Sequence, residues 1–305
     1  MKRIVAFLLL SLLLAVSLYA IGPYWLRLYP VLNPGNRDGH SLAWDETAQR
    51  AILYGSHSGS PQTWAYDPVL NTWANLNTPT NPGLQAHFPM IYDSQNQRTI
   101  LHNVNGTWVY DSTANQWVNR FPAMPSVIQS KMTVMAYDSE SDRTIFFSAE
   151  TGETWAYDYQ NNAWQNMKPP APTPPKDWRG PSATAVYLPL YDRVILVMAF
   201  DSRTWAYDYN TNRWTQRALG PIRGSPGNNN FYYLAYQDST DKTLYYGDDQ
   251  QTWIYDYPTD TWTNLGFVGP PAHHFNVAGM SGKVLLYGGV IPNQNQTWLF
   301  DANGN

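Results

Sequence analysis

The sequence predicts an all-β fold, a six-bladed β-propeller, from two observations: a motif that recurs six times and an N-terminal strand that completes the sixth repeat. The motif is a Thr-Trp pair followed by an apolar residue, an aromatic residue and Asp; its copies are Thr63–Asp67, Thr107–Asp111, Thr154–Asp158, Thr204–Asp208, Thr252–Asp256 and Thr297–Asp301. The steps between successive pairs are 44, 47, 50, 48 and 45 residues. Such a period, built from short strands, is typical of propeller blades.

Each repeat is predicted to hold four strands, as the second repeat shows. A strand that ends at Asp93 turns and returns over residues 98–101, and two further strands begin at Thr107 and Trp117. The Trp-x-Tyr alternation gives the third strand two different faces. The Asp, Asn and Ser residues between the strands favour tight turns because their side chains bond nearby backbone groups.

Charged residues flank the first hairpin of several repeats. Arg98 lies across the turn from Asp93, and Arg143 lies across from Asp138. We expect these to form surface ion pairs that fix the turn, each contributing a few tenths of a kcal/mol.

The strand that closes the ring is predicted at the N-terminus. The sixth repeat has no fourth strand, whereas Trp25 lies 15 residues before His40, much as Trp73 lies 14 residues before His87. We therefore expect residues 24–28 to be the outer strand of the last blade, which leaves no exposed sheet edge at the junction.

The tryptophans are assigned to the fold. Twelve of the 14 occupy repeat positions, six in the Thr-Trp pairs and six in fourth strands. Because each tryptophan can bury about 150–250 Å², we expect these residues to form the core between blades. Trp155→Ala should then lower the melting temperature by many degrees. The aromatic abundance is thus weak evidence for sugar binding.

The N-terminus predicts export. Met1–Arg3 is positively charged, and an apolar run follows over residues 4–21. This pattern is typical of a signal peptide, and the run also has about the minimum length that spans a bilayer. We expect residues 1–21 to be a signal or an anchor and residues 22–305 to be one propeller domain. The protein would be secreted, periplasmic or on the cell surface, touching a membrane only through residues 4–21.

Composition excludes several classes of function. Net charge is −4 without a basic run, which gives no sign of nucleic-acid binding. The chain has no cysteine, so disulfides and thiolate metal sites are excluded. No phosphate-binding loop, nucleophile elbow or His-Glu-x-x-His zinc motif is present. We expect a monomer without a cofactor.

Two features of the repeat point to a family. The pattern Tyr-Asp-x-x-x-Asn-x-Trp occurs at Tyr66–Trp73 and in later copies, and an apolar strand precedes each inner loop, as at residues 52–55. Together they resemble the Kelch repeat over essentially everything after Tyr24. The chain departs from the family's double glycine after the second strand, which only Gly288-Gly289 retains. The resemblance implies Kelch-like blades.

Two groups of enzymes share that blade pattern. Galactose-oxidase-like copper enzymes need a cysteine cross-linked to a tyrosine, which this chain cannot supply. The sialic-acid mutarotases are exported six-bladed Kelch propellers, and they stay open as an alternative, although no local motif maps their residues onto this chain.

All six histidines are predicted near one face, where the second strand leads to the third and the fourth leads to the next blade. They belong to blades that become neighbours on ring closure: His40, His57, His87, His102, His273 and His274. Clustered imidazoles could bind a metal, with His40, His87 and His274 as candidates, or act as bases or contact a ligand. The alternative is structural, with Arg37 and His40 bonding the backbone before the first strand.

The opposite half of that face is predicted to carry charge. The residues concerned are Glu150, Glu153, Arg179, Asp201, Arg203, Arg223, Asp248 and Asp249. Paired acids and arginines could hold a sugar or perform acid–base chemistry. They are also the ordinary content of exposed polar loops.

A proline-rich loop over residues 168–179 carries Trp178 and Arg179. Prolines make this loop extended and stiff. Trp178 would contact a ligand there, or the loop would fold down to cover its own blade. The function these features favour is a non-catalytic binding or scaffold module for a protein or glycan outside the cell. The alternative is an exported sugar isomerase that uses the same face.

Overall fold

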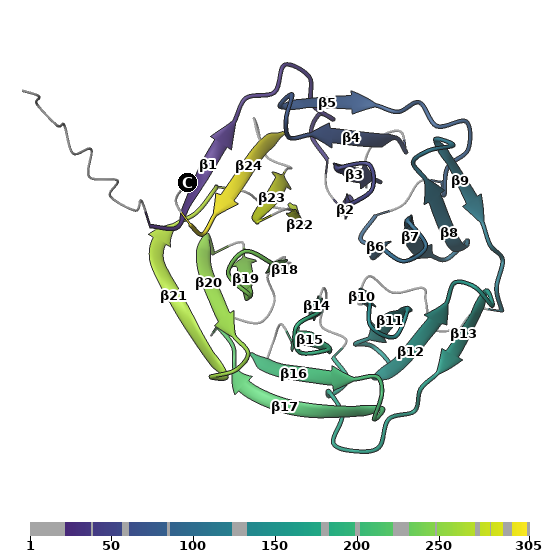
Figure 1. Cartoon of the computed structure of the whole chain (residues 1–305), viewed down its shortest axis with the longest axis vertical. Helices are drawn as coiled ribbons and strands as arrows, with labels where there is room; N and C mark the ends of the chain where they lie inside the picture. Colours follow the sequence, from purple (N-terminus) through teal and green to yellow (C-terminus); the bar gives the residue numbers. More distant parts are fainter. Residues whose placement is uncertain are drawn as a thin grey trace, which may run out of the picture.

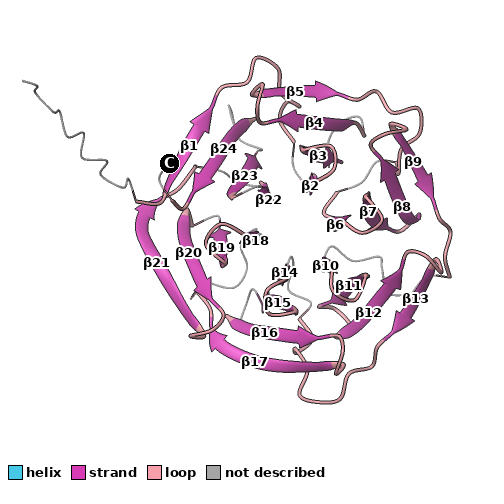
Figure 2. Cartoon of the chain, in the orientation of Figure 1, coloured by secondary structure: helices cyan, strands magenta, loops and turns pink. Residues whose placement is uncertain are grey.

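The computed structural model describes residues 22–37, 39–56, 61–83, 86–123, 133–177, 183–198, 202–221, 232–247, 249–271, 275–280, 282–288 and 295–303. Within these residues, 24 strands form six four-stranded antiparallel sheets arranged as blades around a central axis (Figure 1). The predicted six-bladed propeller is therefore confirmed. Figure 2 shows strands and loops alone in this part of the chain, which has no helix long and apolar enough to cross a membrane.

In blades 1 to 5 the strands form a meander that runs in chain order from the channel outward. Blade 1 holds β2 (Ser41–Asp45), β3 (Arg50–Tyr54), β4 (Thr63–Asp67) and β5 (Thr72–Asn75). Blade 2 holds β6 (Met90–Asp93), β7 (Arg98–Asn103), β8 (Gly106–Asp111) and β9 (Gln116–Asn119). Blade 3 holds β10 (Thr133–Asp138), β11 (Arg143–Ser148), β12 (Glu153–Asp158) and β13 (Ala163–Asn166).

The second half of the ring repeats the plan. Blade 4 holds β14 (Ala183–Leu188), β15 (Arg193–Met198), β16 (Arg203–Asp208) and β17 (Arg213–Leu219). Blade 5 holds β18 (Tyr232–Gln237), β19 (Lys242–Gly247), β20 (Gln251–Asp256) and β21 (Thr261–Val268). Blade 6 holds β22 (Asn276–Met280), β23 (Lys283–Gly288), β24 (Gln296–Asp301) and β1 (Tyr24–Leu28).

The N-terminal strand closes the ring as the sequence predicts. β1 lies antiparallel to β24, with Tyr24 opposite Asp301 and Leu28 opposite Thr297. Figure 1 shows the two strands side by side at the rim, where the first and last described segments meet. Blade 6 thus joins the two ends of the chain through backbone hydrogen bonds.

Antiparallel pairing gives the ring two different faces. In every blade the turn between the first and second strands and the turn between the third and fourth lie on one side, which we call the turn face. The connections between the second and third strands, and those from one blade to the next, lie on the opposite side, which we call the loop face.

The core between blades is built around one repeated hydrogen bond. The indole Nε1 of each fourth-strand tryptophan donates to the hydroxyl of a Thr-Trp threonine in the preceding blade: Trp25 to Thr252 at 2.9 Å, Trp73 to Thr297 at 2.9 Å, Trp117 to Thr63 at 2.9 Å, Trp164 to Thr107 at 2.8 Å, Trp214 to Thr154 at 2.9 Å and Trp262 to Thr204 at 3.1 Å. An aromatic ring of the preceding blade packs beside five of them, as Tyr54 does against Trp117. At every junction, the indole ring thus packs between two blades and its N–H group has a hydrogen-bond acceptor.

The twelve repeat tryptophans differ in burial. Of the fourth-strand tryptophans, Trp73, Trp117 and Trp214 are buried, and the other three are half-buried. The Thr-Trp tryptophans are half-buried, except for Trp205. Trp155, for example, donates its Nε1 to the Glu153 carboxylate at 3.0 Å. More fourth-strand than Thr-Trp tryptophans are therefore part of the interior.

The predicted ion pairs across the first hairpin are wrong. Arg98 pairs with Asp111 at 2.9 Å, and Arg143 pairs in the same way with the third-strand Asp158 at 2.8 Å. The hairpin carboxylates accept hydrogen bonds from turn amides instead, as Asp93 does from the amide of Asn96 at 2.9 Å. The arginines thus join the second strand to the third.

Candidate functional site

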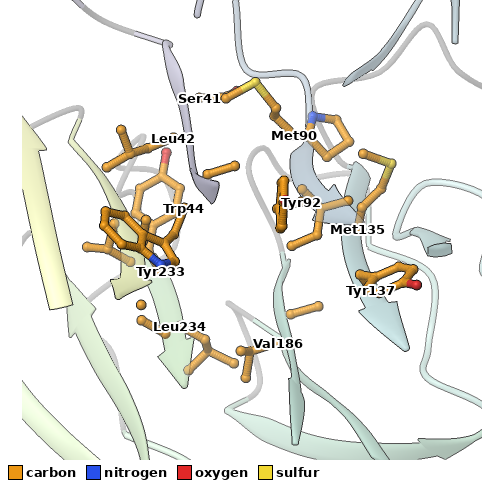
Figure 3. Close-up of a pocket in the computed structure, with 18 of the residues that line it drawn as sticks. Ser41, Leu42, Trp44, Met90, Tyr92, Met135, Tyr137, Val186, Tyr233 and Leu234 are labelled. Atoms are coloured by element: carbon orange, nitrogen blue, oxygen red, sulfur yellow. The ribbon is translucent and has the colours of Figure 1, made fainter. Parts of the chain in front are cut away.

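The innermost strands surround a cavity along the propeller axis. Its volume is about 770 Å³, and its walls come from β2, β6, β10, β14, β18 and β22. Figure 3 shows side chains from several of these strands, among them Leu42, Met135 and Val186, arranged around the opening. Cavities of this size are typical of ligand sites, so the channel is the first place to look for function.

One row of the wall is aliphatic in all six blades. Its members lie in register, through the second strand, with the tryptophan of each Thr-Trp pair: Leu42, Met90, Met135, Ala185, Leu234 and Val277. The next position toward the turn face is also apolar in every blade: Ala43, Ile91, Ala136, Val186, Ala235 and Ala278. The middle of the channel therefore carries aliphatic side chains.

Polar side chains near the loop end of the channel bind neighbouring blades. The Ser41 hydroxyl donates to the Phe88 carbonyl, and the Thr184 hydroxyl accepts from the Leu234 amide at 3.0 Å. The Asn276 side-chain amide donates to the His40 carbonyl at 3.2 Å. These side chains join inner strands to one another.

Charge gathers at the turn end of the channel and is acidic. Glu46 and Asp238 line the cavity there, and the described lining residues include no lysine or arginine. Partial burial, followed by the charges of Asp238 and Asp45, raises the pKa of Glu46 above its usual range. The two carboxylates favour a cation over an anion at this end.

His40 and Arg37 are buried in the wall between blades 6 and 1. The His40 Nε2 lies 3.1 Å from the Tyr287 carbonyl oxygen. The Arg37 guanidinium donates to the carbonyls of Pro34 at 2.9 Å and Gly55 at 3.3 Å, and burial lowers its pKa. These contacts agree with the structural alternative for Arg37 and His40.

His87 lies at the loop end of the channel and is half-buried. Its backbone has a positive φ of 61°, and its amide donates to the Gly39 carbonyl at 2.7 Å. The imidazole packs so closely over Gly39 that a β-carbon there would lie 2.9 Å from the His87 Nε2. The His87 imidazole thus covers the backbone just before His40. These two candidate metal ligands both line the loop end of the channel.

His102 lies between blades 2 and 3 and does not line the channel. It is fully buried, its Nδ1 is 2.9 Å from the Thr107 hydroxyl, and its ring packs 4.8 Å from that of Trp164. Burial lowers the pKa of His102 to about 3, which keeps the imidazole neutral. It stands where the other junctions place Tyr54, Phe147, Val197, Tyr246 and Tyr287, so it serves as one of the packing rings.

Glu153 and Arg203 share one repeat position, immediately before the Thr-Trp pair. The Glu153 carboxylate accepts the Trp155 indole hydrogen bond, as Gln62 does for Trp64 at 3.1 Å. Arg203 opens β16 opposite Leu219 and is half-buried. In blades 1 and 3 the residue at this position accepts a hydrogen bond from the indole of the Thr-Trp tryptophan. Aligning the repeats in the sequence could have identified this shared position, but it was not predicted.

Glu150 and Asp249 are exposed, and Asp249 accepts a hydrogen bond from the Gln251 amide at 3.1 Å. The remaining candidates lie outside the described residues: His57, Trp178, Arg179, Asp201, Arg223, Asp248, His273 and His274. They therefore stay predictions, as does a metal site that includes His274. The proline-rich loop is described up to Asp177, which is buried and donates its amide to the Ala149 carbonyl at 2.7 Å. This part of the loop therefore lies against the β11–β12 connection of blade 3.

One acidic group on the turn face was not anticipated from the sequence. Oxygen atoms of Asp138, Glu140 and Asp192 lie within 4.8 Å of one another. The Asn210 side chain donates to Glu140 at 3.2 Å and to Asp192 at 2.9 Å, and burial raises the pKa of Asp138. The Asn210 amide thus supplies hydrogen bonds to two of the three carboxylates.

Exposed apolar side chains gather on the loop face. Twelve large apolar side chains are exposed in the described part of the chain, and seven of them lie on this face: Tyr29, Val31, Leu32, Val104, Phe121, Leu219 and Val268. Val31 and Phe121 are 93% and 78% exposed. The turn face has Val69, Leu70 and Leu190. No sequence pattern predicts this difference, since the residues follow strand ends at irregular places.

No family model matches the chain, and no curated protein matches it. The fold and the geometry of its faces are therefore the basis for any functional conclusion.

Proposed function

We propose that this protein is an exported, Kelch-like propeller that acts as a non-catalytic binding module and takes a protein ligand on its loop face. The observation that carries the proposal is the excess of exposed apolar side chains on that face. Exposed aromatic and aliphatic groups of this kind favour protein contact, because their burial supplies the main driving force of association.

The construction of the ring supports a scaffold role. Six tryptophan–threonine bonds fix each blade to the one before it. Loops held by such a frame can differ without disturbing the core, which is why binding residues concentrate on loops. The described histidines are consistent with this role, because His40 and His102 contribute to the frame through contacts to Tyr287 and Thr107.

A matched pair of variants tests the face. Val104→Asp with Phe121→Asp changes the loop face of blade 2, and Val69→Asp with Leu70→Asp makes the same chemical change on the turn face of blade 1. Each form of the purified chain is used as bait against the extracellular fraction of its source cells, and the proteins bound by the wild type are then titrated individually.

We expect a partner that binds the wild type and the turn-face variant but loses at least about tenfold in affinity for the loop-face variant. Equal loss in both variants, or no partner at all, would contradict the proposal. A glycan array and a sugar-mutarotation assay run beside it, and a saturable sugar ligand or turnover would favour the isomerase alternative instead.

Export is tested separately. Expression of the whole chain in its source cells, followed by fractionation and N-terminal sequencing, should place the propeller outside the cytoplasm, with or without residues 1–21. Recovery of the intact chain in the cytoplasm would contradict this part of the proposal.

A further inference from the structure

We infer that the central channel binds a short, extended peptide with small apolar side chains, its amino end toward the turn face. This goes beyond the proposed function, since it concerns the channel and not the loop face, and a free peptide should bind whether or not a folded partner docks.

The edges of the inner strands supply the first argument. The strands β2, β6, β10, β14, β18 and β22 each have a single neighbour in their sheets. Figure 1 shows these six strands around the central opening. The Leu234 amide of β18 is already bonded to the Thr184 hydroxyl. Backbone N–H and C=O groups that such edges leave open can be recognised by an extended peptide, which adds itself as a further strand.

The side chains of the wall supply the second argument. A peptide strand projects its side chains alternately to opposite sides. Aliphatic side chains line the channel at one level in all six blades and at the next level in every blade except blade 3. Small apolar side chains would be buried against this wall. The wall thus combines hydrogen-bonding strand edges with apolar surface. An extended peptide uses both, whereas a hydrocarbon would use only the apolar surface and a sugar mainly the hydrogen bonds.

Dimensions agree with this ligand. The inner strands have four to six residues, and strands of five to six residues span about 17–20 Å. A cavity of about 770 Å³ extends along them from His87 at the loop end to Glu46 at the turn end. A peptide of similar length therefore lies within the ring along its axis.

Charge sets the direction. Glu46 and Asp238 are the carboxylates at the turn end, and no basic side chain offsets them among the described lining residues. A free peptide amino group carries a positive charge at neutral pH. The amino end is therefore favoured at the turn face, and a terminal carboxylate is disfavoured there.

The experiment titrates the full chain with a synthetic peptide of alternating valine and alanine, of five residues in keeping with the strand length, with a free amino end and an amidated carboxyl end. Binding is followed by calorimetry. Two control peptides are the same sequence acetylated at its amino end and the same sequence with alternate amide nitrogens methylated, which removes backbone donors but keeps the side chains.

The protein variants narrow the channel with apolar side chains, so the chemical character of the wall does not change. Ala185→Met gives blade 4 the residue that blades 2 and 3 already have in the same row, at Met90 and Met135. Ala183→Val, nearer the loop end, is a milder variant if the first one fails to fold. Val69→Asp on the turn-face rim is the control, and Glu46→Gln tests the direction of the peptide.

We expect one peptide per chain, about tenfold weaker binding to Ala185→Met, and unchanged binding to Val69→Asp. The methylated peptide should lose about tenfold or more. Acetylation and Glu46→Gln should each cost a few-fold and should not add, because they remove the same charge interaction. No saturable binding, equal binding of the methylated peptide, or no effect of the channel variants would overturn the inference.

Discussion

The junctions between blades and the wall of the channel are built on opposite plans. Every junction has the same indole-to-hydroxyl bond, from Trp25 on Thr252 round to Trp262 on Thr204. The wall keeps its aliphatic character but varies the residue, from Ala185 to Leu234 and Met90. The difference teaches that strict repetition marks the residues that hold the ring together, whereas the residues of the channel wall conserve only their chemical type from blade to blade.

The largest effect is expected at a junction. Trp73 is fully buried, so Trp73→Ala should reduce the free energy of unfolding by about 3–5 kcal/mol. Trp155 is half-buried, and Trp155→Ala should cost clearly less. Denaturant unfolding of both variants measures the difference. Equal losses would mean that the two sets of tryptophans hold the fold to the same extent, and Trp73→Phe separates the lost hydrogen bond from the lost volume.

A second effect is expected where two inner strands approach closely. A β-carbon at Gly279 would lie 2.3 Å from the Tyr236 carbonyl oxygen of the neighbouring blade. Gly279→Ala should therefore force the blades apart and destabilise the fold by about 1–3 kcal/mol. Gly22→Ala is the control, since nothing lies within 4 Å of that position. A neutral Gly279→Ala, in thermal unfolding, would show that the wall tolerates displacement.

His102 makes one junction sensitive to acid. Its pKa in the folded protein is about 3, below the ordinary value of 6.5, so the unfolded chain binds more protons between these values. Stability is therefore lost as the pH falls from 6.5 toward 3, by about 2 kcal/mol at pH 5. His102→Phe copies Phe147 of the next blade and should reduce the difference in stability between pH 7 and pH 5 by that amount. An unchanged difference would contradict the burial of this imidazole.

The smallest effect is expected on the turn face. Arg98 and Asp111 form an ion pair whose side chains are 29% and 26% exposed, so Arg98→Ala should cost less than about 1 kcal/mol. Asp93→Ala should cost more, because the Asp93 carboxylate bonds the turn amide of Asn96. Thermal unfolding of the two variants gives the order directly, and the reverse order would contradict the role of Asp93 in bonding the turn.

The sequence predicts the ring because its signals are periodic. The spacing of the Thr-Trp pairs and the position of Trp25 gave the blades and their closure, and the structure confirms both. The partner of Arg98 was missed because a residue in a second strand has a neighbour on each side, and the sequence does not rank them. The residues that line the channel were not singled out, for a related reason: Leu42 and Val186 belong to apolar strands, and nothing local distinguishes a side chain that faces a neighbouring blade from one that borders a cavity.

The pairing of β1 with β24 also has a consequence in time. Tyr24 is among the first described residues and Asp301 among the last, yet they face each other in one sheet. Synthesis proceeds from the N-terminal end, so β1 waits for its partner until nearly the whole chain exists. Until β24 has been synthesised, the sixth blade lacks its outer strand and the ring is open. The pairing that closes the ring therefore forms late.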